Sequence, residues 1–139
     1  PRLGPGDVVA LTGDRGAGKT TLVRGLARGL CVAEPDAVAS PTYLLVVEHH
    51  GPVPFVHADA YLPAKLRGFL EDGGLEYLFD AEKAVAVEWA DRIRNLLPEK
   101  LLWVELQRGP RPGRRVVLRA ARAGDYPWLR EIPSMDPSG

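Results

Sequence analysis

The sequence has a single cysteine, no long apolar run and no excess charge, and each of these absences excludes a class of protein. Cys31 alone cannot form an internal disulfide or a cysteine-built zinc site, which fits a reducing, cytoplasmic setting. No apolar stretch approaches the roughly 18 residues that a membrane span needs, so no membrane association is expected. Eighteen basic residues balance eighteen acidic ones, so no overall field favours a nucleic acid.

The length of 139 residues is that of one domain with one core. Apolar residues make up 45% of the chain and charged residues 26%, which is typical of a globular protein. We assign residues 1–131 to a single domain. Residues 132–139, rich in Pro, Ser and Gly, are expected to form a loose tail.

Short apolar runs alternate with amphipathic stretches along the chain. The expected strands are residues 8–11, 43–47, 54–59, 84–89, 101–106 and 115–119, with a turn at 49–52. The expected helices run from residue 19 to a break at 34–36, over 63–70 up to an interruption at Gly73-Gly74, and over 90–97, with a helical turn at 125–130. Strand and helix alternate early and antiparallel strands follow late, which predicts an α/β domain with a mixed, partly parallel sheet.

Residues 13–20, GDRGAGKT, match the phosphate-loop pattern Gly-x-x-x-x-Gly-Lys-Thr. Glycines let successive backbone N–H groups turn inward around a phosphate, and the following helix points its positive end at the same anion. Lys19 would neutralise the β- and γ-phosphates, and the Thr20 hydroxyl would bind Mg²⁺. An accidental Gly-rich turn is the alternative, which the buried strand before the motif and the amphipathic helix after it disfavour. The nucleotide-binding set is Gly13, Asp14, Arg15, Gly16, Ala17, Gly18, Lys19, Thr20 and Thr21.

ATP is the expected nucleotide, because the chain has no Asn-Lys-x-Asp stretch of the kind that reads guanine. A phosphate loop also needs a carboxylate on a neighbouring strand to hold Mg²⁺ through water. Asp59 and Glu88 each end an apolar run, and in a parallel sheet both would lie beside the loop. Strand-end carboxylates also serve as helix caps or solvated charges, which is the alternative for both.

Thr42 and three histidines carry weaker signals. Pro41 stiffens the turn before Thr42, so the Thr42 hydroxyl could sense the γ-phosphate. An ordinary turn would use the same residues. His49 and His50 point to opposite faces of a strand and do not make a metal site. His57 lies on the same strand face as Asp59 and could orient it.

In five stretches the sequence resembles the TsaE (YjeE) family of small bacterial ATPases that act in threonylcarbamoyladenosine (t6A) modification of tRNA. The stretches are PGDVVALTGDRGAGKTTLVRGLARGL, SPTY, HADAY, GLEYLFD and VEWADRI. The resemblance implies a three-layer P-loop NTPase-like fold that binds ATP or ADP with Mg²⁺. It also implies protein partners TsaD and TsaB, with tRNA met only through that complex.

The resemblance also implies roles for single residues. Lys19 and Thr20 would be the phosphate and magnesium ligands, and Thr42 would lie in a switch-like loop near the γ-phosphate. Asp59 would take the Walker B-like role, Glu88 would be a second acidic residue required for activity, near the metal, and Trp89 would lie near the nucleotide. Ordinary core packing is the alternative for Trp89.

One departure from the family pattern concerns an arginine. The family usually has a Tyr-Arg pair after the aspartate, whereas here Tyr61 is followed by Leu62. The function of that arginine is therefore lost or supplied by another residue, such as Arg67. Separately, the turn that contains Arg108, Arg111, Arg114 and Arg115 could contact tRNA or a partner, and a solvated hairpin tip is the favoured interpretation.

The sequence thus predicts an Mg-dependent ATPase that is slow alone and stimulated by partners, with Glu88, Thr42 and Lys19 as its catalytic residues. Two alternatives remain at this point. One is a small-molecule P-loop kinase, which needs an acceptor pocket and an Arg-rich lid that the sequence does not clearly offer. The other is a nucleotide-gated binding module with negligible turnover.

Overall fold

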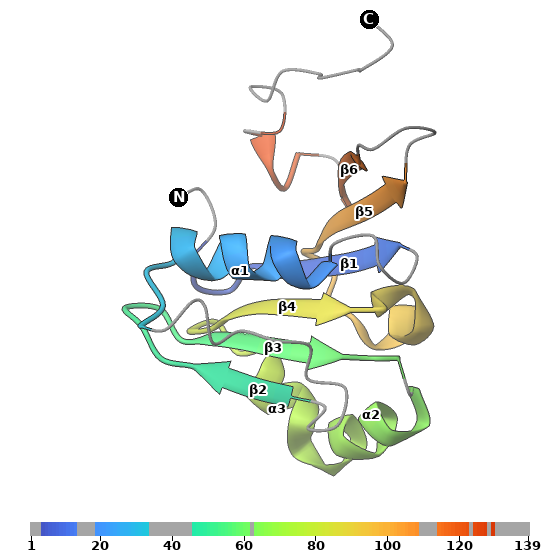
Figure 1. The fold of residues 1–139 in the computed structure, drawn as a ribbon. Helices are drawn as coiled ribbons and strands as arrows, with labels where there is room; N and C mark the ends of the chain where they lie inside the picture. The colour runs from blue at the N-terminus through green and yellow to red at the C-terminus, as the bar shows by residue number, and fades with distance from the viewer. Residues whose placement is uncertain are drawn as a thin grey trace, which may run out of the picture.

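The protein is built on a six-stranded mixed sheet (Figure 1). The computed structural model describes residues 4–13, 19–33, 46–61, 63–108, 114–122, 124–127 and 129. The strands are β1 (Val8–Gly13), β2 (Val46–His49), β3 (Phe55–Asp59), β4 (Ala84–Glu88), β5 (Leu102–Arg108) and β6 (Arg114–Ala120). Their order across the sheet is β2-β3-β4-β1-β5-β6.

The four central strands, β3, β4, β1 and β5, run parallel, and the edge strands β2 and β6 pair antiparallel with their neighbours. This arrangement confirms the predicted α/β class with a mixed, partly parallel sheet. Because the central strands are covered on both faces, they read as continuous apolar runs, as VVAL in β1 and AVAV in β4 do.

Helices cover both faces of the sheet and complete three layers. Helix α1 (Lys19–Gly29) packs on one face, and its buried side chains share a core with Val9, Leu11 and Phe55. The other face is covered by α2 (Pro63–Phe69), η2 (Leu70–Gly74), α3 (Leu75–Leu78) and the 3₁₀ helix η3 (Ala90–Leu96). The second core contains the alternate residues of the same strands, including Val8 and Ala10.

The local predictions hold for most elements and fail at two. Residues 43–45 of the strand predicted over 43–47 lie outside the described residues. The described strand β2 continues through His49, which pairs with Phe55, so His49 is a strand residue and not part of the turn. The helix predicted over 90–97 is a 3₁₀ helix with a non-helical residue, Ile93, inside it. Gly73, at φ 93°, interrupts the helical region as predicted.

At the C-terminal end, the N–H of Leu129 bonds to the carbonyl of Tyr126 at 3.0 Å, in agreement with the predicted helical turn. Tyr126 packs into the core on the α1 side. The tail assigned to residues 132–139 lies outside the described residues. Within the described part of the chain, no helix combines the length and the apolar character needed to cross a membrane.

Candidate functional site

The phosphate-loop motif connects the central strand β1 to helix α1. β1 ends at Gly13 and α1 begins at Lys19, so strand, loop and helix follow one another as the motif requires. Lys19 and Thr20 form the first turn of α1, and Thr21 is exposed on the same helix. Residues 14–18, the side chains of Lys19 and Thr20, and the loop with Thr42 lie outside what the structure describes, so their assigned roles stay predictions.

Gly13 is where the motif meets the neighbouring strand. Its φ is 138°, and a Cβ at this position would lie 2.4 Å from the backbone carbonyl oxygen of Leu106 in β5. No side chain fits in that space, and the backbone angle is one that L-residues rarely adopt. The first glycine of the motif is thus required by the packing of β1 on β5.

Asp59 and Glu88 lie side by side at the ends of parallel strands. Asp59 is the last residue of β3, Glu88 is the last residue of β4, and the two are register partners. Glu88 is also the partner of Leu11 in β1, because β4 lies between β1 and β3. Figure 1 shows the three strands ending at the same edge of the sheet. The prediction that both carboxylates lie at the phosphate-loop edge agrees with this topology.

Both carboxylates belong to the sheet face that α1 covers. Side chains alternate along a strand, and Phe55, Ala84 and Ala86 pack in the core on the α1 side. Asp59 and Glu88 continue those two alternating rows. Asp59 is 2% exposed and Glu88 is 3% exposed. Both carboxylates are therefore buried, which argues against the alternative of solvated charges.

Glu88 is hydrogen bonded to a buried histidine on the next strand. Nε2 of His57 lies 2.5 Å from Oε2 of Glu88, and His57 is 0% exposed. The sequence interpretation that His57 orients Asp59 is therefore wrong, since the ring bonds to Glu88. Alternation along β3 predicts which face of the sheet His57 lies on. Its hydrogen-bond partner depends on the register between β3 and β4, which the sequence of β3 does not contain.

The backbone after Asp59 is fixed by two further bonds. Oδ1 of Asp59 accepts a hydrogen bond from the N–H of Tyr61 at 2.7 Å. The N–H of Ala60 donates to the carbonyl of Glu88 at 2.9 Å. The first bond closes a local turn at the end of β3, and the second connects the ends of β3 and β4 directly after the two carboxylates.

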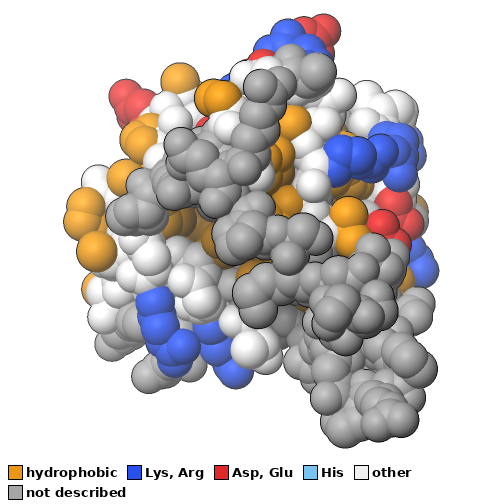
Figure 2. Space-filling model, turned by 90° about the horizontal axis from the view of Figure 1, so that it is seen from above, with side chains coloured by type: hydrophobic (Ala, Val, Ile, Leu, Met, Phe, Trp, Pro, Cys, Tyr) orange, Lys and Arg blue, Asp and Glu red, His pale blue; other side chains and the backbone are white. Residues whose placement is uncertain are grey.

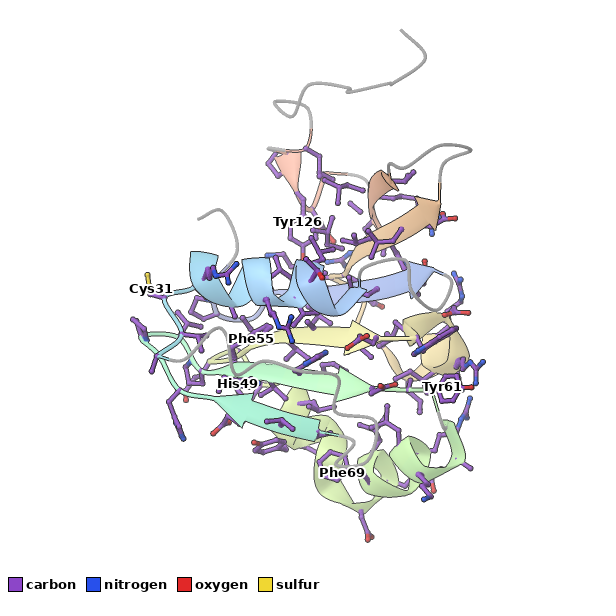
Figure 3. All side chains as sticks on the ribbon, viewed as in Figure 1. Cys31, His49, Phe55, Tyr61, Phe69 and Tyr126 are labelled. Atoms are coloured by element: carbon purple, nitrogen blue, oxygen red, sulfur yellow. The ribbon has the colours of Figure 1, made fainter. Side chains whose placement is uncertain are left out.

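Trp89 follows Glu88 in the left-handed conformation, with φ 57°. This angle is rare for a bulky residue and turns the chain sharply from β4 into η3. The ring centroids of Trp89 and Tyr61 are 5.2 Å apart, and Tyr61 lies just beyond the end of β3 in Figure 3. Trp89 directly follows Glu88 in the chain and packs against the core on the η3 side, and its proximity to a nucleotide stays a prediction.

Arg92 covers this aromatic pair and was not singled out by the sequence analysis. Its guanidinium carbon is 4.9 Å from the ring centroids of Tyr61 and of Trp89, and Nη1 donates to the carbonyl of Tyr61 at 2.6 Å. Arg67, suggested for the missing arginine function, instead donates to the carbonyl of Arg92 and to Asn95. The sequence signal that could have found Arg92 is its position three residues after Trp89, one helical turn away.

The donor set at the two strand ends suits a hard cation. Mg²⁺ is held in proteins by one or two carboxylates together with water and substrate phosphates. In the described part of the chain, no group of three or more His, Cys, Asp and Glu side chains could hold a metal by itself. Two carboxylates beside a phosphate-loop motif therefore fit Mg²⁺, with the phosphates and water supplying the remaining ligands.

His49 lies on β2, away from the carboxylates and near Phe55, as Figure 3 shows. Burial, together with the neighbouring His57 and His50, lowers its pKa from the usual 6.5.

The basic turn between β5 and β6 lies outside the described residues. On the face of the molecule that Figure 2 shows, the coloured Lys and Arg side chains form separate groups.

Comparison with known proteins identifies the family. The sequence model described as threonylcarbamoyl adenosine biosynthesis protein TsaE matches residues 1–116. The chain belongs to the TsaE family. A TsaE from Bacillus subtilis is 37% identical over 117 residues, covering 84% of this chain and 71% of the relative. A TsaE from Treponema pallidum is 37% identical over 105 residues, covering 76% of each.

A solved structure has the same fold. The crystal structure of Bacillus subtilis YdiB superposes with a TM-score of 0.69 at 32% sequence identity, covering 93% of this chain and 77% of that one. This agrees with a P-loop NTPase-like fold of three layers. The resemblance noted from the five sequence stretches is confirmed.

Proposed function

We propose that this chain is an Mg-dependent ATPase that supports t6A modification of tRNA by driving a TsaD–TsaB complex through a conformational cycle. The observation that carries the proposal is the register pair of Asp59 and Glu88, two buried carboxylates at the edge where β1 enters the GDRGAGKT motif. Membership of the TsaE family supplies the biosynthetic context. A role in tRNA modification would place the protein in the cytoplasm.

In the proposed mechanism, the residues position the phosphates and the attacking water and do no covalent chemistry. Lys19 neutralises charge on the β- and γ-phosphates, and backbone N–H groups of the loop surround them. Thr20 and Asp59 would hold Mg²⁺, Asp59 through water, and Glu88 would be the second acidic residue at the metal. The bound Mg²⁺ supplies charge neutralisation for the phosphate oxygens.

Glu88 is assigned the orientation or activation of the attacking water. Its carboxylate is buried, and electrostatic groups act more strongly where water is excluded. Thr42 is assigned to sense the γ-phosphate, and Trp89 to contact the nucleotide. The ATP and ADP states would differ in the Thr42 loop, which gives the partners a state to recognise.

The test is ATP hydrolysis by the purified chain alone and with TsaB–TsaD. We expect slow hydrolysis that the partners accelerate, and no hydrolysis by Lys19→Ala under either condition. A pull-down with TsaB–TsaD in ATP and in ADP, with the same variant as control, tests the nucleotide-dependent contact. Equal capture in both nucleotides would contradict the proposed cycle.

The two alternatives are outcomes of the same experiments. Transfer of ³²P from ATP to a metabolite would identify a kinase. Nucleotide-dependent capture without single-turnover hydrolysis, with or without TsaB–TsaD, would identify a binding module. We expect neither, and we expect tRNA to be contacted only through the complex.

A further inference from the structure

We propose that His57 is a positioning residue that holds the Glu88 carboxylate in place for hydrolysis. The inference rests on the proposed function, because it assigns a task to Glu88 in that reaction. Three observations lead to it: the bond between the two side chains, the small residue that makes room for it, and the unpaired second nitrogen of the imidazole.

The bond links two groups that are removed from water. The side chain of His57 is 0% exposed and that of Glu88 is 4% exposed, with 2.5 Å between Nε2 and Oε2. A buried carboxylate needs a donor, and in the described part of the chain His57 is the side chain that bonds to Glu88. With Glu88 ionised the carboxylate only accepts, so Nε2 carries the proton.

The register between β3 and β4 makes this contact possible. His57 is the register partner of Ala86, and Asp59 is the partner of Glu88, so His57 and Glu88 are diagonal neighbours. Alanine is the smallest side chain after glycine, so we infer that Ala86 on the α1 face does not obstruct the imidazole as it reaches diagonally toward Glu88. The contact therefore depends on a small residue at position 86.

The second nitrogen of the ring argues against a purely structural role. Nδ1 of His57 is buried and has no hydrogen-bond partner among the residues that the structure describes. A buried ring nitrogen without a partner is costly, and an apolar side chain would fill the same site without that cost. The bond from Nε2 to Glu88 offsets part of this cost, and this bond is what distinguishes His57 from His49, whose buried Nε2 also lacks a partner among the described residues.

A fixed carboxylate is an advantage in this reaction because positioning dominates phosphoryl transfer. A water-orienting group that shifts by about 1 Å can lose a factor of about 100 in rate. Without His57, Glu88 can rotate about its side-chain torsions. Nucleotide binding should be spared, since the phosphate loop provides it.

The experiment compares His57→Gln with His57→Asn. A glutamine amide can reach the position of Nε2, whereas an asparagine amide cannot, so the two variants differ in reach and not in polarity. We expect Asn to lower kcat for partner-stimulated hydrolysis about 10- to 100-fold and Gln to retain most of it. The affinity for a fluorescent ADP analogue should change less than about twofold in both. His57→Leu is a third variant without any donor and should behave like Asn.

His49→Leu is the matched control. His49 lies on the same sheet face, on the adjacent strand. Its Nε2 is also buried and has no partner in the described part of the chain, but it makes no bond to Glu88. Its removal should leave kcat unchanged. In a Glu88→Gln background, His57→Asn should cause no further loss, because the two residues act as one unit.

The outcomes separate this inference from the proposed function. A wild-type chain that does not hydrolyse ATP with TsaB–TsaD overturns both. If the wild type hydrolyses ATP, a His57→Asn variant with unchanged kcat overturns the inference alone. So does an equal loss in the Gln and Asn variants, or a loss that persists in the Glu88→Gln background.

Discussion

Asp59 and Glu88 are partners across two parallel strands, and each is the last residue of its strand. Their environments differ: Oδ1 of Asp59 accepts a backbone N–H from Tyr61, whereas Glu88 is bonded to the imidazole of His57. Two adjacent buried carboxylates with different partners can serve different steps. In the proposed mechanism, Asp59 holds the metal and Glu88 orients or activates the attacking water.

Substitution should separate these two roles. We expect Asp59→Asn to raise the Mg²⁺ concentration for half-maximal hydrolysis by about 10- to 100-fold, the range for a group that holds a metal through water. Glu88→Gln should lower kcat about 100-fold, as expected for loss of a general base. Steady-state rates over a Mg²⁺ titration measure both. If Glu88→Gln shifted the Mg²⁺ requirement as much as Asp59→Asn, Glu88 would be mainly a metal ligand.

The packing at Gly13 predicts a large effect on stability. In Gly13→Ala the new Cβ meets the carbonyl oxygen of Leu106 at 2.4 Å, and φ 138° is strained for alanine. Overpacking and backbone strain together should lower the free energy of unfolding by about 3 kcal/mol. Gly25→Ala is the control, because that position in α1 is open and alanine favours the helix by up to about 1 kcal/mol. In urea unfolding, the free energy of unfolding should decrease in Gly13→Ala and increase in Gly25→Ala.

The Arg92 guanidinium should stabilise the turn after β4. Its contacts with the rings of Tyr61 and Trp89 and with the Tyr61 carbonyl are lost in Arg92→Met, which keeps the apolar stem. We expect a loss of about 1 kcal/mol in unfolding free energy, the scale of exposed cation–π contacts, and a decrease in kcat of a few fold. Arg67→Met is matched in chemistry but removes no ring contact. Equal kcat losses in the two variants would argue against a specific role for Arg92.

His49 should make folding stability depend on pH. Its pKa is lowered in the folded protein, chiefly by burial, so the folded state favours the neutral ring. Below the unfolded value of 6.5 the unfolded chain binds the extra proton, and stability is lost as the pH falls through that value. His49→Gln should flatten the dependence of unfolding free energy on pH in this window. His50→Gln should leave most of it, because the charge of His50 is only a minor cause.

The sequence predicts the parts of this fold that depend on local pattern. Apolar runs place β1, β3 and β4, the phosphate-loop motif joins β1 to α1, and two strand ends supply Asp59 and Glu88. Contacts that depend on register are not encoded in any one stretch, and the bond between His57 and Glu88 is such a contact.

The backbone conformation at position 89 is the second feature that the sequence does not predict. A left-handed tryptophan at position 89 contradicts local preference, and it is tolerated only because Tyr61, Arg92 and the core under η3 hold it there. That turn also directs the chain into a 3₁₀ helix where periodicity alone predicted a regular helix. The predictions for Thr42 and for residues 14–18 concern positions outside the described part of the chain.

The place of β4 between β1 and β3 also orders the assembly of the site during synthesis. The phosphate-loop strand is made first and the strand with Asp59 second, yet the two are not neighbours until residues 84–88 insert between them. A ribosome-bound chain that ends before Glu88 therefore contains the GDRGAGKT motif without its carboxylates in place. In the proposed function, the magnesium site formed by the two carboxylates can therefore assemble only after residues 84–88 have left the ribosome.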